Sequence, residues 1–168
     1  QIAALGDDVG SMSTAALNSL TSAQVRGLST AQVQALTSTQ VGQLGTTQVS
    51  ALSGAQIGAI DTGDLVQITA ATLNTLSSSQ VGCLSTAQVA NLSTAQVATL
   101  GSTQAGALST AQVQALTSTQ AAQLTSTQLA GFNTAQIAAL GADVGSMSTA
   151  ALNSLTSSQV GGLSTAQV

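Results

Sequence analysis

An octapeptide repeat runs through nearly the whole sequence and restricts the folds that the chain can adopt. Its pattern is L-[ST]-[ST]-[AT]-Q-V-x-[AGQT], which residues 28–35 show clearly. Octads start at residues 5, 12, 20 and 28, then at every eighth residue to 140, and finally at 147, 155 and 163. The units 5–11 and 140–146 are each one residue short. We number the octad positions 1 to 8 from the leucine.

The polar positions of the octad carry the signature of a helix start. Position 2 holds only Ser, Thr, Gly, Asp61 or Asn133, which are the residues that cap helix N-termini. Three residues later comes Gln in 15 of the 21 units, as in Ser29 with Gln32. This is the capping-box spacing, in which the hydroxyl accepts from a backbone N–H and the Gln side chain reaches back to the cap residue. Each octad therefore predicts one short helix that begins after position 2.

The apolar spacing indicates how these helices are arranged. In one long helix, eight residues would advance the apolar stripe by about 80°, so no single face could be buried. A simple strand is disfavoured because positions 1 and 6 would point to opposite faces. One octad buries a Leu and a Val, worth roughly 3–6 kcal/mol, against roughly 8–16 kcal/mol of backbone entropy, so octads must stack.

We therefore predict an all-α solenoid of very short capped helices, one per octad. Leu and Val should lie inside, Gln partly buried at the corners, and Ser and Thr outside. The alternative is a β-solenoid with three octads per coil, which the Thr and Val content favours and the Ala, Gln and capping pattern disfavours.

A longer repeat is superimposed on the octads. Residues 136–168 match residues 1–33 with three differences, which defines a superrepeat of 135 residues. The differences are Asp7 to Ala142, Ala23 to Ser158 and Arg26 to Gly161. No composition shift or charge run marks a linker, so we expect residues 1–168 to form one continuous array, a slice of a longer one. Seventeen units per superrepeat divide by neither two nor three, which leaves the number of octads per coil open.

Composition argues against most site chemistry. The chain has no His, Lys, Glu, Trp, Tyr or Pro, its net charge is −4, and Arg26 is its one basic residue. Without the usual general bases we expect no catalytic residue and no enzyme activity. Cys83 alone cannot form a zinc or iron site, so we expect no metal or cofactor. One Arg cannot neutralise a nucleic-acid backbone. No apolar run approaches the roughly 18–20 residues of a membrane span, so we expect no transmembrane segment.

Two acidic segments interrupt the pattern, namely Asp7-Asp8 and the stretch from Asp61 to Asp64. Carboxylates at this spacing could be considered for Ca²⁺, but they match no EF-hand loop. Helix capping explains them better, with Asp61 as N-cap and Asp64 near the positive end of the helix dipole. Arg26 occupies the variable position 7 and is replaced in the second copy, which argues against a specific anion site.

The tandem LSTAQVxAL and LTSTQVxxL octads resemble the low-complexity, adhesin-like arrays of very large secreted or surface proteins of Gram-negative bacteria. The resemblance covers essentially the whole chain and contains no catalytic or ligand motif. It implies a fibrous role and a secreted or cell-surface location.

We therefore predict a structural repeat protein that forms an extracellular fibre, sheath or adhesin stalk and associates with copies of itself, laterally or end to end. With 4% charged residues, little repulsion keeps copies apart, and positions 3 and 7 should face solvent or a neighbouring chain. The alternative is ice binding by rows of Thr and Ser. Third-position residues other than Thr interrupt such a row along the sequence, among them Ser22, Ser38, Gly54, Ala70, Ser78, Ser102, Ser118 and Ser126.

Overall fold

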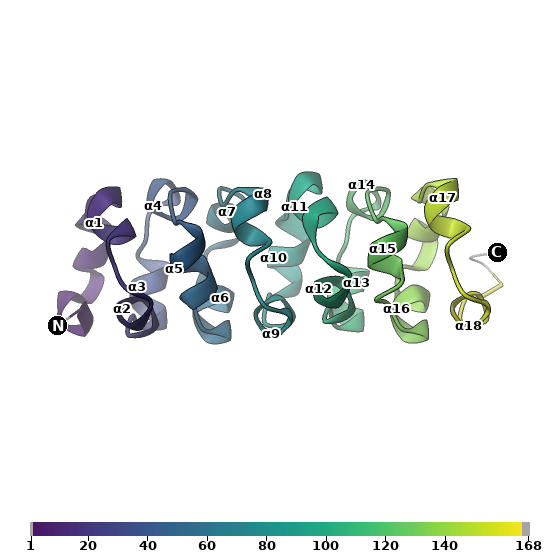
Figure 1. The fold of residues 1–168 in the computed structure, drawn as a ribbon, viewed down its shortest axis with the longest axis horizontal. Coiled ribbons are helices and arrows are strands. Elements are labelled where there is room, and N and C mark those ends of the chain that lie inside the picture. The colour runs from purple at the N-terminus through teal and green to yellow at the C-terminus, as the bar shows by residue number, and fades with distance from the viewer. Residues whose placement is uncertain (1, 166–168) are drawn as a thin grey trace.

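In the computed structural model, which describes residues 2–165, the chain is a rod of short stacked helices (Figure 1). The described part contains two 3₁₀ helices and 18 α-helices and no strand. In chain order they are η1 (Ile2–Ser11), α1 (Thr14–Asn18), α2 (Ser22–Arg26), α3 (Thr30–Gln34), α4 (Ser38–Gly42), α5 (Thr46–Ala51), α6 (Gly54–Ala59), α7 (Thr62–Leu65), α8 (Ala70–Leu73), α9 (Ser78–Gly82), α10 (Thr86–Asn91), α11 (Thr94–Thr99), α12 (Ser102–Gly106), α13 (Thr110–Gln114), α14 (Ser118–Ala121), α15 (Ser126–Leu129), α16 (Thr134–Ala139), η2 (Gly141–Ser146), α17 (Thr149–Leu152) and α18 (Ser157–Val160). The predicted all-α solenoid is confirmed, and the β-solenoid alternative is wrong.

Local capping explains why each α-helix is so short. The three predicted caps Ser29, Ser85 and Ser109 have extended backbone, and each Oγ accepts from the N–H three residues later at 3.0–3.2 Å. After four to six residues the chain ends each helix and extends again at the next position 2. The capping prediction is therefore confirmed at these serines.

Glycine at position 2 behaves in two different ways. Gly45 and Gly101 precede helices without a side-chain cap. Gly6 and Gly141 are not N-caps, so the capping prediction is wrong for them, because their φ angles are 51° and 56°. Gly141 follows directly after α16 and its C-cap Leu140, where a left-handed residue commonly ends a helix.

The seven-residue units contain 3₁₀ helix in place of α-helix, as η2 shows. A 3₁₀ helix rises about 2.0 Å per residue, against about 1.5 Å for an α-helix. The tighter helix therefore lets a unit with one residue fewer span a similar side of the coil.

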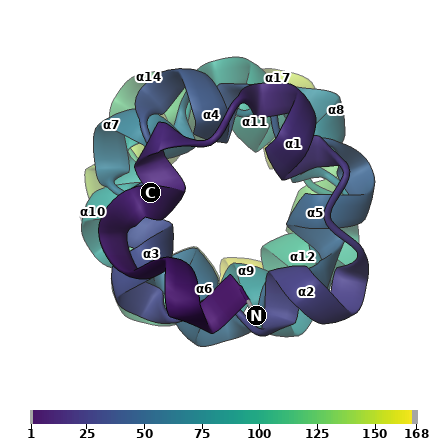
Figure 2. The same ribbon diagram turned by 90° about the vertical axis from the view of Figure 1, so that its left-hand side faces the viewer.

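The coil does not contain a whole number of octads. Each helix packs on the third element after it, while hydrogen bonds between coils join residues mostly 28 to 31 positions apart. One turn therefore takes between three and four octads, which answers the question that the sequence left open. In Figure 2, the chain runs clockwise as it recedes from its N-terminal end, so the solenoid is right-handed, and the stacked helices wind gradually around the axis.

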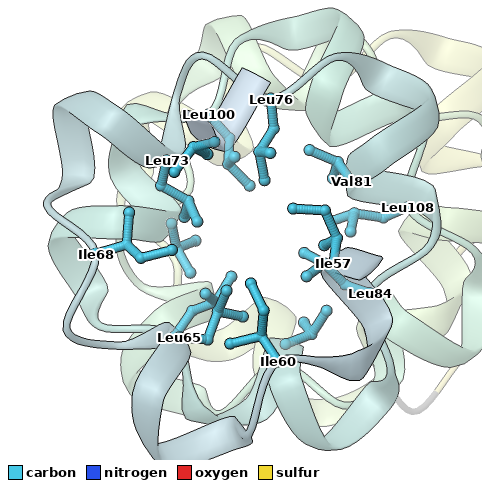
Figure 3. Packing of buried hydrophobic residues seen from close by; sticks show 14 of the residues in the cluster. Ile57, Ile60, Leu65, Ile68, Leu73, Leu76, Val81, Leu84, Leu100 and Leu108 are labelled. Carbon is cyan, nitrogen blue, oxygen red and sulfur yellow. The ribbon is translucent and has the colours of Figure 1, made fainter. Parts of the chain in front are cut away.

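Positions 1 and 6 of the octads form one continuous core along the rod. Ile57, Ile60, Leu65 and Ile68 point inward from successive helices and corners (Figure 3) and are at most 3% exposed. These side chains belong to one hydrophobic cluster that runs through the stacked coils. The octads consequently depend on stacking, because no single unit encloses its apolar residues.

Candidate functional site

The most regular polar contact in the molecule is made by the buried Gln at position 5. The Oε1 atom of Gln88 accepts from the backbone N–H of Ser85 at 2.8 Å, which completes the predicted capping box. Its Nε2 atom donates to the carbonyl oxygens of Ile57 and Ile60, at 2.9 and 2.8 Å, in the preceding coil. One side chain therefore caps its own helix and hydrogen-bonds the coil before it.

This contact recurs along the rod, and we call the set of glutamine-to-carbonyl hydrogen bonds between coils the amide ladder. Its donors are Gln40, Gln48, Gln56, Gln80, Gln88, Gln96, Gln104, Gln112, Gln120, Gln128, Gln136 and Gln159. All are at most 8% exposed, so the prediction of partly buried Gln understates their burial. The acceptor carbonyls lie about one coil back along the chain. The octad pattern alone could therefore indicate the capping bond, whose partners are three residues apart, but not the ladder.

The octad positions that point away from the core form the outer surface of the rod. Position 4, which is Ala, Thr, Ser or Gly, is exposed in every described full octad. Position 2 is exposed in most units, although its oxygen is occupied by capping. The rod therefore presents small hydroxyl and methyl groups at a fixed repeat.

Position 7 is exposed in most octads, as predicted, and in some it also borders the next coil. A Cβ atom on Gly42 or Gly82 would lie 3.2–3.3 Å from a backbone oxygen of the next coil, at Gln67 and Ala107 respectively. At Gly106 it would lie only 2.4 Å from the Gly131 oxygen, so α12 and α15 need glycine to approach this closely. Position 7 therefore lies on the outside of the rod, and at a few glycines, such as Gly42 and Gly106, it is half-buried where it approaches the next coil.

Stacking rearranges the third-position residues that the sequence shows as interrupted. Because α7, α10, α13 and α16 stack in order, Thr62, Thr86, Thr110 and Thr134 follow one another in a single column. The last three are exposed and Thr62 is half-buried. The column is curved rather than flat because the stacked helices wind around the axis (Figure 2).

Two acidic residues, Asp64 and Asp143, bond serines of the preceding coil, and Asp61 caps its own helix. Asp61 caps α7 by accepting from the Gly63 N–H at 2.8 Å, one residue earlier than the expected third helical position. The carboxylate of Asp64 accepts from the Ser38 hydroxyl, in the coil before it. Asp143 accepts from Ser118 in the same way, at 2.5 Å. In the described part of the chain no three His, Cys, Asp or Glu residues gather into a metal-binding group.

Arg26 and Cys83 occupy outer positions. Arg26 is the last residue of α2 and is exposed. The free thiol of Cys83 lies over Gly54 of the preceding coil, where a Cβ atom would overlap the sulfur at 2.3 Å. Cys83 stands at position 8, which other octads fill with residues such as Ala, Gly, Gln or Thr.

The surface of the rod carries open hollows where helices stack, and two of them are lined in part by Asp61 or Arg26. Another lies where α9, α12 and α15 stack and is lined by residues such as Ser78, Ser102, Thr127 and Gly131. It offers hydroxyl and backbone groups, without a titratable side chain in its lining. None of the helices between residues 2 and 165 is long and apolar enough to cross a membrane.

The fold and its repeated surface define a structural repeat protein of the helical-solenoid class. The ALTTAQ repeat model matches residues 2–38, 57–94, 90–118 and 141–168, and the chain belongs to this family. The six letters correspond to position 8 followed by positions 1 to 5, as in residues 107–112. No curated protein matches the chain in sequence.

Proposed function

We propose that this structural repeat protein is a segment of an extracellular fibre, sheath or adhesin stalk. The solenoid supplies length, and the outer surface supplies lateral contacts between copies. The proposed role is mechanical, does not include catalysis, and places the protein outside the cell or on its surface.

The amide ladder is the observation that carries this proposal. Its bonds connect each coil to the previous one, so the directional hydrogen bonding of the repeat runs along the rod. Hydrogen bonds to two defined carbonyls per Gln resist sliding and rotation of adjacent coils, which favours a stiff rod. A rod whose coils are joined by hydrogen bonds along its axis is suited to span a distance as a stiff fibre or stalk.

The outer surface supports the lateral contacts. Exposed position 4 carries no charged residue in any full octad, where only the seven-residue units hold Asp8 and Asp143, and the whole chain has a net charge of only −4 over 168 residues. A surface with little charge and a regular pattern of small side chains allows two rods to approach closely. A weak contact per coil, multiplied along many coils, would hold two copies together.

Electron microscopy of the purified chain tests the proposal directly. We expect bundles or filaments for the unmodified protein. Replacing Ala31, Ala87, Ala111 and Ala135 with Glu should disperse them into single rods, because position 4 is exposed. Glu is compatible with the fold there because it lies in the first helical turn, close to the positive end of the dipole.

The matched control replaces the same four alanines with Gln, which has the size of Glu without its charge. This variant should still form bundles, and both variants should keep the helical circular-dichroism spectrum. Unchanged bundles of the Glu variant at low salt would contradict lateral contact through this surface and favour an isolated stalk.

Ice binding is the second candidate, and the column Thr62, Thr86, Thr110 and Thr134 favours it. The winding of the column disfavours it, because a rigid ice plane requires a flat row of groups. Thermal hysteresis of the purified chain, and its loss in a Thr110→Leu variant, would support ice binding. Freezing behaviour identical to that of a buffer control would exclude it.

A further inference from the structure

The amide ladder is interrupted at two places. In the units 60–67 and 68–75, position 5 holds Asp64 and Thr72. In the units 140–146 and 147–154, position 5 holds Val144 and Ala151. Each interruption therefore covers two consecutive units, which is more than half of one coil.

The interruptions leave defined carbonyl groups outside the ladder. The ladder bonds that flank the first interruption are donated by Gln56 and Gln80, whose amides reach the position 1 carbonyls of Leu28 and Leu52 at 2.8 and 2.5 Å. The corresponding carbonyls between them, Leu36 and Leu44, receive no glutamine amide. Leu116 and Leu124 are the corresponding pair below the second interruption.

A carboxylate contact crosses the coils where the amides are missing. Asp64 accepts from Ser38 in the first case, and Asp143 accepts from Ser118 in the second. Both serines are at octad position 3, and both bonds join exposed side chains on the outside of the rod. These contacts are therefore more open to solvent than the buried glutamine bonds, and water competes for their hydrogen-bonding groups.

Larger apolar side chains accompany the loss of glutamine. Position 6 holds Leu65, Leu73 and Leu152 in the three octads of these interruptions, where most other units hold Val. The additional methylene increases apolar burial, which has no preferred direction. A Gln amide between two carbonyls fixes one arrangement of the coils, whereas apolar contact tolerates small rotations.

The two interruptions share the same surroundings. The segments 28–44 and 108–124, on which they stack, differ only at positions 41 and 42, which correspond to 121 and 122. A spacing of 80 residues separates the interruptions, and the superrepeat places a further copy of the second at residues 5–19. The feature therefore recurs with the repeat and is not an isolated substitution.

We propose that the two interruptions are compliant joints at which an otherwise stiff rod bends and twists. The first joint is formed by residues 60–75 stacked on α4 and α5. The second is formed by residues 140–154 stacked on α14 and α15. In a fibre, such joints would confine bending to set positions along the rod, but the inference depends only on the solenoid and not on self-association.

Distances between pairs of spin labels test the first joint. Labels at Ala31→Cys and Ala87→Cys span it, and labels at Ser79→Cys and Ala135→Cys span the same number of residues where the ladder is complete. All four sites are exposed, and Cys83→Ser removes the native thiol in both proteins. Double electron–electron resonance should give a distance distribution at least about twice as wide for the first pair. Equal widths would overturn the proposal.

Restoring the ladder provides a second test. Asp64→Gln together with Thr72→Gln should narrow the distribution of the Ala31/Ala87 pair to that of the control. The reverse exchange, Gln112→Asp with Gln120→Thr, should broaden the distribution of the Ser79/Ala135 pair, because the amide bonds to the carbonyls of Leu84 and Leu92 lie between these labels. Retention of the original widths after both exchanges would show that glutamine does not control the compliance.

Hydrogen exchange of the unlabelled chain gives an independent readout. The N–H groups of the cap residues Asp61 and Thr69 lack the glutamine acceptor that protects Ser85 and Ser93. We expect backbone amides of α7 and α8 to exchange about tenfold to a hundredfold faster than those of α10 and α11, in line with the loss of one or two net hydrogen bonds. Equal protection would contradict a joint at this position, whatever the outcome of the bundling experiment.

Discussion

Replacing Gln88 with Leu should destabilise the solenoid far more than the repetitive sequence would suggest. The side chain is 1% exposed and makes three hydrogen bonds, to the Ser85 N–H and to the carbonyls of Ile57 and Ile60, all at 2.8–2.9 Å. Each such bond contributes about 1 kcal/mol net, and backbone groups left buried without partners cost about 1–3 kcal/mol each. Leu offsets about 1–2 kcal/mol of this through apolar burial. We expect the free energy of unfolding to fall by about 2–4 kcal/mol.

Urea unfolding followed by circular dichroism at 222 nm measures this loss. Gln114→Leu is the matched control because Gln114 is the exposed last residue of α13. Its effect should stay within about 0.5 kcal/mol, as for most surface substitutions. Comparable unfolding midpoints for the two variants would refute the assignment of the buried glutamines as the bonds between coils.

The charged counterpart Gln88→Glu separates hydrogen bonding from packing. The new carboxyl group would face the carbonyl oxygens of Ile57 and Ile60, which repel the carboxylate but can accept from the protonated acid. Burial among acceptors raises the pKa of this carboxyl above the ordinary value of about 4.3. The variant should therefore be strongly destabilised at pH 7 and regain stability as the pH falls through the raised pKa. The difference from the unmodified protein, measured in urea at pH 7 and pH 4, should shrink, and a constant difference would argue against this geometry.

Three further predictions follow from the local structure. Ser85→Val should lower the free energy of unfolding by about 1 kcal/mol in the same urea assay, because the cap on the Gln88 N–H is lost, and a neutral result would contradict the capping role. Gly141→Ala should lower the free energy of unfolding by about 1–2 kcal/mol, because the φ of 56° disfavours a residue with a Cβ atom. Gly145→Ala should not show this loss, because only Gly141 of the two has positive φ, and a Cβ atom would meet nothing within 4 Å at either site. A synthetic peptide of residues 28–43 should be unfolded by circular dichroism, because Val33 and Val41 are buried by stacking, and a stable isolated fold would contradict the solenoid.

Short-range patterns explain why so much of the fold could be predicted from the sequence. The Ser29 hydroxyl and the Gln32 backbone N–H are three residues apart, so the capping box is visible in the octad itself. The spacing of positions 6 and 1 likewise places Val33 and Leu36 on one helical face, and both are buried. Glycine was the exception, because Gly45 and Gly141 share a sequence position and adopt different backbone conformations.

The candidate surface could be predicted only in part. The neutral Ser, Thr and Ala exterior follows from composition, and position 4 is exposed as a helix of this phase requires. The close approach of some position 7 glycines to the next coil could not be seen in the octad, because it depends on contacts such as that between Gly106 and Gly131. The column from Thr62 to Thr134 was hidden for the same reason, since its members are 24 residues apart and separated by other octads.

The sequence by itself determined one capped helix per octad, an apolar interior and a nearly uncharged exterior, because these depend on residues within a few positions of one another. The tertiary structure decided the number of octads per coil, the second role of each Gln and the places where that role is missing. These features depend on backbone groups mostly 28 to 31 residues away, such as the carbonyls that meet Gln88. Only the pitch of the stacked coil determines which groups meet across that separation, and no local pattern in the octad encodes it.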